Sequence, residues 1–173
     1  RNLERLRGFH QFMRALPSIQ RFHPNVRAMI VGDNGAGYGG LEECGRGLRE
    51  VMIDEIGSQI DFERVHFLGR ISYPALLTLL QASWVHVYLT YPYILGWSLL
   101  EAMACGCCIV GSNGMPIEEV IKNGSNGILI PFNQPQELAA KVCSLLANSS
   151  MRRMLGEQAR VDSLAWDQSV MTP

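Results

Sequence analysis

The chain has 173 residues, of which 47% are hydrophobic and 18% are charged, a composition typical of one ordered globular domain. Its net charge of -1 excludes a nucleic-acid surface built on bulk positive charge, so we expect no nucleic-acid partner. Five cysteines without a disulfide framework, and no secretory signal at the start, favour a cytoplasmic protein.

Hydrophobic periodicity and turn residues divide the chain into alternating helices and strands. The first helix contains Pro17, which is expected to end or bend it. In chain order, the patterns predict a helix over 6–16, a strand over 26–32, a helix over 41–57, a strand over 64–70, a helix over 72–83, a strand over 84–90, a helix over 97–106, a strand over 107–112, a short helix over 115–124, a strand over 126–131, and helices over 134–150 and 151–165.

This alternation predicts an α/β fold with a doubly wound, Rossmann-like parallel sheet covered on both faces. Residues 1–173 would form a single domain. Because no strand precedes the first helix, the first strand of the sheet is expected to be missing, which suggests one domain of a larger protein. Polar residues, proline and glycine interrupt the apolar stretch over 75–100, so we interpret it as buried core and not as a membrane span.

Two segments are candidates for binding phosphate. The first, "VGDNGAGYGG", matches G-x-G-x-x-G at Gly35, Gly37 and Gly40, after a strand and before a helix, as in dinucleotide-binding proteins. However, the acidic residue expected at the end of the next strand is replaced by Arg70. A glycine-rich loop without a dinucleotide is therefore the favoured interpretation, and an oxidoreductase remains an alternative.

The second candidate is the start of the helix "WSLLEAMACG". Free backbone N–H groups of Gly96, Trp97 and Ser98, together with the helix dipole, would bind an anion. Glu101 lies one turn further on the same face, and its carboxylate would accept hydrogen bonds from the two hydroxyls of a ribose. A phosphate and a ribose at this spacing fit a nucleotide; the alternative is a structural carboxylate bonded to nearby backbone.

The cysteine-rich run "CGCC" suggests a metal site only weakly. It lacks a second Cys-x-x-Cys pair, and the histidines are scattered along the sequence. We therefore expect no bound metal and no cofactor.

The segment from Trp97 to Val142 resembles the donor-binding, C-terminal domain of family 4 retaining glycosyltransferases, which have the GT-B fold. The matching residues are Leu100-Glu101-Ala102-Met103-Ala104, Gly106, Gly114, Glu119-Val120 and Asn126-Gly127. Upstream strands and the closing helix follow the family order, so the resemblance covers almost the whole chain. It implies binding of a nucleotide-diphosphate sugar and transfer of the glycosyl group with retention.

The resemblance also implies roles for individual residues. Glu101 would hold the ribose, and the amides of Gly96, Trp97 and Ser98 would meet the diphosphate. Arg7, before a glycine, falls where the family places a basic residue that contacts the diphosphate. Ile71 falls where backbone groups meet the base.

Three departures from the family pattern stand out. Tyr93 occupies the place of an earlier glutamate tied to the donor sugar, so we treat Tyr93 as a candidate catalytic residue with an altered role. The first strand and its Gly-Arg pair are absent. The N-terminal acceptor domain is absent too, so the chain alone is expected to be inactive.

The sequence therefore predicts part of a bacterial glycosyltransferase of glycan biosynthesis. We expect the protein in the cytoplasm, either in solution or at the inner face of the membrane. The missing domain would hold a glycan, lipid or small-molecule acceptor. Two alternatives stay open: a GT-B-like sugar-nucleotide epimerase and a non-catalytic nucleotide-binding module.

Overall fold

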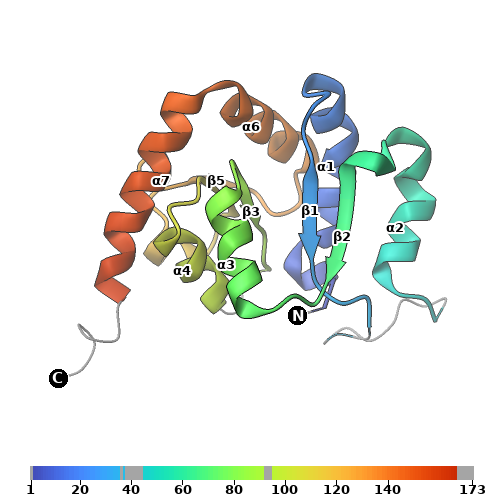
Figure 1. The fold of residues 1–173 in the computed structure, drawn as a ribbon, viewed down its shortest axis with the longest axis horizontal. Coiled ribbons are helices and arrows are strands. Elements are labelled where there is room, and N and C mark those ends of the chain that lie inside the picture. The colour runs from blue at the N-terminus through green and yellow to red at the C-terminus, as the bar shows by residue number, and fades with distance from the viewer. Residues whose placement is uncertain (1, 36, 38–44, 92–94, 167–173) are drawn as a thin grey trace.

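The computed structural model of the chain describes residues 2–35, 37, 45–91 and 95–166. Its strands are parallel to their neighbours and alternate with helices, which confirms the predicted Rossmann-like α/β fold (Figure 1). The strands are β1 (Ala28–Val31), β2 (Val65–Gly69), β3 (His86–Tyr88), β4 (Ile109–Ser112) and β5 (Ile128–Ile130). The α-helices are α1 (Phe9–Phe22), α2 (Leu48–Ile56), α3 (Tyr73–Ala82), α4 (Trp97–Ala104), α5 (Ile117–Val120), α6 (Pro135–Ala147) and α7 (Ser149–Ser163). Short 3-10 turns are η1 (Arg5–Arg7), η2 (Gly57–Gln59), η3 (Phe62–Arg64) and η4 (Leu164–Trp166).

The strands form two half-sheets instead of the single sheet that the sequence predicts. One contains β1 and β2, and the other has the order β3-β4-β5. The first half-sheet packs into one apolar cluster and the second into two. Strand β4, at the centre of the second half-sheet, is buried along its whole length. No helix of the described residues is both long and apolar enough to cross a membrane.

Helix α1 joins the two half-sheets. Met13 and Leu16 pack into the cluster of β1, β2 and α2, while Ala15 and Ile19 pack into the cluster of β4, β5 and α6. Pro17 was predicted to end or bend this helix; it lies inside the helix, which continues to Phe22, so the first alternative is wrong. Burial on both sides of the proline offsets the cost of its lost backbone hydrogen bond.

Helix α2 begins at Leu48, later than the predicted start at residue 41. Gly45 has a left-handed backbone (φ 70°) and Gly47 is extended (φ -70°, ψ 154°), so neither continues a helix. Residues 41–44 lie outside the described part of the chain.

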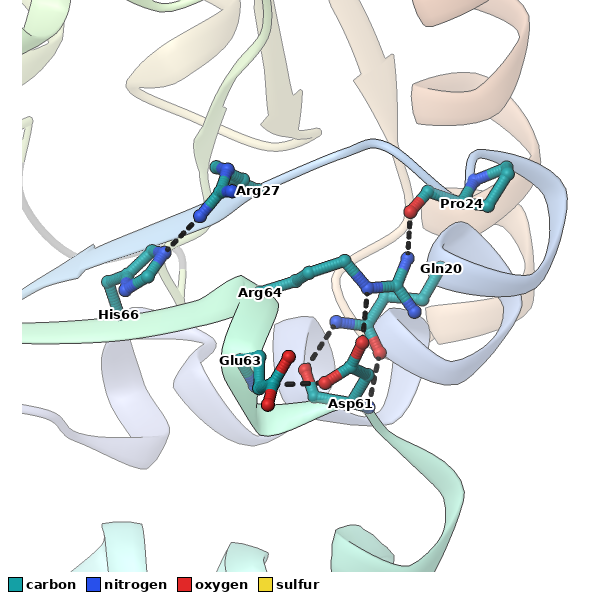
Figure 2. A network of polar contacts seen from close by, with 7 residues as sticks. All are labelled: Gln20, Pro24, Arg27, Asp61, Glu63, Arg64 and His66. Carbon is teal, nitrogen blue, oxygen red and sulfur yellow. Dashed lines mark hydrogen bonds and ion pairs between the residues drawn. The ribbon is translucent and has the colours of Figure 1, made fainter.

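A polar network fixes the amino-terminal end of β2 to α1 (Figure 2). The buried Gln20 side chain exchanges two hydrogen bonds with the Asp61 backbone, of 2.8 and 3.0 Å. Arg64 pairs with the Asp61 carboxylate at 2.7 Å and donates to the Pro24 carbonyl at 2.5 Å. A hollow of about 630 Å³ borders this network, at the opposite end of the strands from the site described below.

Helix α7 closes the domain over α4 and α6. Arg152 donates two hydrogen bonds, of 2.6 and 2.7 Å, to the carbonyls of Leu145 and Leu146 at the end of α6. Gly156 rests directly on the Gly106 backbone, and a Cβ atom at Gly156 would collide with the Gly106 carbonyl. A residue without a side chain therefore sets the distance between α7 and the turn that follows α4.

Candidate functional site

The orientation of helix α4 explains why an apolar helix carries a carboxylate. Leu99, Ala102 and Met103 are its buried residues and face the core. Trp97 is 69% exposed, Ser98 is exposed, and Glu101 is half-buried. Glu101 therefore lies outside the core-facing side of the helix.

The first turn of α4 offers fewer free amides than the sequence predicts. The Gly96 N–H donates a hydrogen bond of 2.8 Å to the buried Tyr88 hydroxyl, so this amide is already paired. Gly96 is the N-cap, and no side chain caps the helix. The N–H groups of Trp97 and Ser98 remain at the helix start, where the partial positive charge of the helix dipole favours an anion.

Arg7 reaches the same helix start from the other end of the sequence. Its Nη1 atom lies 3.6 Å from the point that a Cβ of Gly96 would occupy. The following Gly8 has a left-handed backbone (φ 68°), and any Cβ there would collide with Leu89. This close packing of Gly8 on Leu89, the residue after β3, places the guanidinium beside α4, where its positive charge adds to that of the helix start.

The end of β2 supplies the residue predicted to meet a base. Ile71 is half-buried and follows Gly69, which has a left-handed backbone (φ 63°). The neighbouring Arg70 pairs with Asp33, at the end of β1, with an Nε–Oδ2 distance of 3.2 Å. Because both side chains are at least half exposed, this pair contributes little stability.

Parts of two predicted sites lie outside the described residues. These are Tyr93, the candidate catalytic residue, and Gly40, the last glycine of the dinucleotide motif. Within the described part of that loop, a Cβ at Gly37 would collide with the Glu4 carboxylate.

Tyr88 is the site residue that sequence reasoning missed. The pattern over 84–90 correctly predicts a strand, but it assigns no task to the tyrosine at its end. A buried phenol needs a hydrogen-bond partner, and here the partner is the N-cap amide of α4. No local sequence pattern indicates this pairing, because it depends on how the end of β3 packs against the start of α4.

The two adjacent cysteines of "CGCC", Cys107 and Cys108, lie in different apolar clusters. Cys107 belongs to the cluster under α4 and donates to the Leu80 carbonyl, while Cys108 belongs to the cluster under α6. Burial raises the pKa of Cys107 to about 12 and that of Cys108 to about 11, so both are thiols at neutral pH. In the part of the chain that the structure describes, no group of three His, Cys, Asp or Glu residues is placed to hold a metal ion.

With this geometry in view, comparison with known proteins places the chain in a family. The family model described as glycosyl transferases group 1 matches residues 1–162. The chain belongs to this glycosyltransferase family. Over 110 residues it is 32% identical to an uncharacterized glycosyltransferase of Methanocaldococcus jannaschii, a match that covers 61% of this chain and 28% of that protein. The chain thus spans well under half the length of the relative that it matches.

Solved structures share the fold of this group 1 glycosyltransferase chain. The C-terminal domain of a glycosyl transferase group 1 family protein, LpcC from Francisella tularensis, superposes with a TM-score of 0.81 at 18% identity, covering 95% of this chain and 81% of that one. Anabaena Alr3699/HepE in complex with UDP superposes with a TM-score of 0.76 at 26% identity, covering 94% of this chain and 42% of that one.

Proposed function

We propose that this chain is the donor-binding, C-terminal domain of a family 4 retaining glycosyltransferase and that its ligand is a nucleotide-diphosphate sugar. The observation that carries the proposal is the meeting of Arg7 with the start of α4, one helical turn before Glu101. A cation and two helix-start amides suit a diphosphate, and a half-exposed carboxylate one turn on suits a ribose. The UDP complex of the similar Anabaena protein supports the same ligand class.

In the proposed reaction, the bond between the anomeric carbon of the sugar and the diphosphate oxygen breaks. A new bond forms between that carbon and an acceptor hydroxyl oxygen on the same face, and the hydroxyl proton is released. Negative charge grows on the departing diphosphate, and the Arg7 guanidinium and the amides of Trp97 and Ser98 would stabilise it. These groups are fixed before the reaction, so this charge would need no metal ion.

The remaining roles belong to the same proposal. Ile71 would meet the base with its backbone, and Tyr93 would contact the donor sugar. A second domain of the longer protein would hold the acceptor, a glycan, lipid or small molecule. In this proposal the longer protein is bacterial and lies in the cytoplasm.

The test separates the ribose role from the diphosphate role by titrating two ligands, UDP and uridine, into the longer protein by calorimetry. Glu101→Gln should weaken both ligands at least tenfold, because a hydrogen bond to a charged group contributes about 1.5–3 kcal/mol and tenfold corresponds to about 1.4 kcal/mol. Arg7→Met should weaken UDP and leave uridine unchanged, since uridine has no phosphate.

Glu157→Gln, an exposed carboxylate on α7, is the matched control and should bind as the unmodified protein does. Unchanged binding of both ligands to Glu101→Gln, with an intact melting transition, would contradict the ribose role. Parallel titrations with GDP and ADP identify the preferred base.

A further inference from the structure

An exposed tyrosine lies at the carboxyl end of the second half-sheet, next to the candidate anion site. Tyr91 follows β3 and is 54% exposed. Its N–H donates to the Leu6 carbonyl at 2.8 Å, so its backbone adjoins Arg7, the residue after Leu6. Because ligands of open parallel sheets bind beyond the carboxyl ends of the strands, the Tyr91 ring is placed where a ligand can reach it.

Both the backbone and the ring of Tyr91 are held in place. Thr90, directly before it, is buried; its N–H donates to the Ser112 hydroxyl at 3.0 Å, and that hydroxyl donates to the Thr90 carbonyl at 2.8 Å. The Tyr91 ring stands nearly perpendicular to the ring of Phe132, which follows β5, with their centroids 6.0 Å apart. A side chain that is fixed before its ligand arrives loses little entropy when the ligand binds.

Asn133, the residue after Phe132, offers amide donors beside this ring. Its Oδ1 atom accepts a hydrogen bond of 3.2 Å from the Nε2 atom of Gln11, in the first turn of α1. This bond fixes the carbonyl end of the Asn133 amide. Asn133 is exposed, and within the described residues its Nδ2 group has no hydrogen-bond partner. Two N–H donors of a fixed amide are thus left for a ligand.

The residue that fixes Asn133 lowers the stability of the fold. Gln11 is 6% exposed, and in the described part of the chain its buried Oε1 atom has no hydrogen-bond partner. An apolar side chain of similar size would not leave such an oxygen unpaired. Its Nε2 atom contacts the neighbouring His10 ring, at 3.1 Å, and Asn133. Residues that act against stability are expected at functional sites, and the contact that leads outward from Gln11 is Asn133.

We propose that Tyr91 and Asn133 form a subsite for the pyranose ring of the donor sugar, with Phe132 and Gln11 as positioning residues. One face of a pyranose consists of C–H groups, which suit the electron-rich face of an aromatic ring. Its rim carries hydroxyls, which accept hydrogen bonds from amide N–H groups such as those of Asn133. The inference rests on the proposed function, because Arg7, beside Tyr91, is the residue proposed for the diphosphate.

The order of the elements assigns this ring to the donor and not to the acceptor. Ile71, proposed for the base, follows β2 in the first half-sheet, and Arg7 precedes α1, which packs against both half-sheets. Tyr91 and Asn133 follow β3 and β5, in the second half-sheet. A donor with its base at Ile71 and its diphosphate at Arg7 would therefore extend its sugar over the second half-sheet.

Calorimetry on the longer protein tests the subsite by comparing a nucleotide sugar with its own nucleoside diphosphate. The nucleotide sugar is whichever of UDP-glucose, UDP-N-acetylglucosamine and GDP-mannose the unmodified protein binds most tightly. Tyr91→Ala should weaken it by about fivefold or more, the scale of one aromatic contact, and leave the diphosphate within about twofold. Tyr91→Phe keeps the ring and should bind both ligands normally. Tyr73→Ala, at an exposed tyrosine on α3, is the matched control and should change neither affinity.

Unchanged binding of the nucleotide sugar to Tyr91→Ala would overturn the subsite while leaving the proposed function intact. Failure of the unmodified protein to bind any nucleoside diphosphate would instead contradict the proposed function, and the subsite with it.

The positioning role of Gln11 has its own test, with the same two ligands. Gln11→Leu and Asn133→Ala should each weaken the nucleotide sugar and leave the nucleoside diphosphate unchanged, because neither residue touches the diphosphate in the proposed arrangement. Equal weakening of both ligands by Gln11→Leu would show that Gln11 only supports the packing of α1 and Arg7, and the positioning role would be wrong.

Discussion

At the scale of single residues, the Tyr88 hydroxyl fixes the start of α4. Tyr88→Phe removes the acceptor and leaves the Gly96 N–H buried without its partner, which costs about 1–3 kcal/mol. We expect a lower free energy of unfolding in urea and weaker UDP binding, because the helix start that holds the diphosphate loses its anchor. Tyr73→Phe, at an exposed position on α3, should change neither quantity. Equal stability of the two variants would contradict this role.

His86 gives the stability of the protein a distinct pH dependence. Burial lowers the pKa of His86 to about 4, against an ordinary value of 6.5 in the unfolded chain. Below pH 6.5 the unfolded chain binds a proton that the folded protein does not, so stability falls as the pH drops from 6.5 to 4. The loss amounts to up to about 3 kcal/mol, since one pH unit corresponds to about 1.4 kcal/mol.

The measurement is the free energy of unfolding in urea at several pH values, for the protein and for His86→Leu. Three carboxyl groups also lose their contribution to stability in acid, because hydrogen bonds in the folded protein lower their pKa values. They are Glu50, bonded to Asn34, Glu55, bonded to Arg14, and Asp61, bonded to Arg64. Both proteins share this loss, so subtracting their free energies of unfolding at each pH leaves the contribution of His86. A difference that stays constant from pH 7 to 4 would show that His86 does not titrate in this way.

At the scale of elements, helix propensity and packing make opposite predictions for Gly156. Alanine is a better helix former than glycine by about 1 kcal/mol, which predicts a more stable α7. The collision of the new methyl with the Gly106 carbonyl predicts the reverse, because backbone cannot move aside as a flexible side chain would. We expect Gly156→Ala to lower the free energy of unfolding.

The control is an exposed position of the same helix, Arg153→Ala, which should change stability by less than about 0.5 kcal/mol. A higher free energy of unfolding in urea for Gly156→Ala than for the unmodified protein would contradict this. It would show that α7 can shift away from the turn after α4 without loss of stability.

The sequence predicted elements better than the contacts between them. All five strand segments are confirmed, because β-branched runs between turns are local signals. The start of α2 was misplaced, since Gly45 and Gly47 interrupt a helix only through their backbone angles. The pairing of Gly96 with Tyr88 depends on packing across the fold, which no local pattern encodes. Arg7 could be assigned to the start of α4 only through the family resemblance, because the two segments are far apart in the sequence.

At the scale of the whole molecule, α1 couples the two half-sheets into one folding unit. Its residues fill the apolar clusters of both halves, so neither half can lose α1 and stay buried. All three tryptophans, Trp84, Trp97 and Trp166, belong to the half with β3, β4 and β5. Their fluorescence therefore reports on that half, while far-UV circular dichroism reports on both.

We expect the two signals to give superimposable unfolding curves in guanidinium chloride. Ile19→Ala, which opens a cavity where α1 meets the second half, should lower both midpoints by the same amount. Separate midpoints for fluorescence and circular dichroism would mean that the halves unfold independently.

The protonated state of the two buried cysteines has a consequence for oxidation. Oxidants attack the thiolate, and burial raises the pKa of the Cys108 thiol to about 11, so very little of this sulfur is ionised at pH 7.4. An ordinary thiol with a pKa near 8.5 is ionised in about one in fourteen. Although they stand in the most cysteine-rich stretch of the sequence, the buried Cys107 and Cys108 should react slowly with peroxide and stay reduced in air.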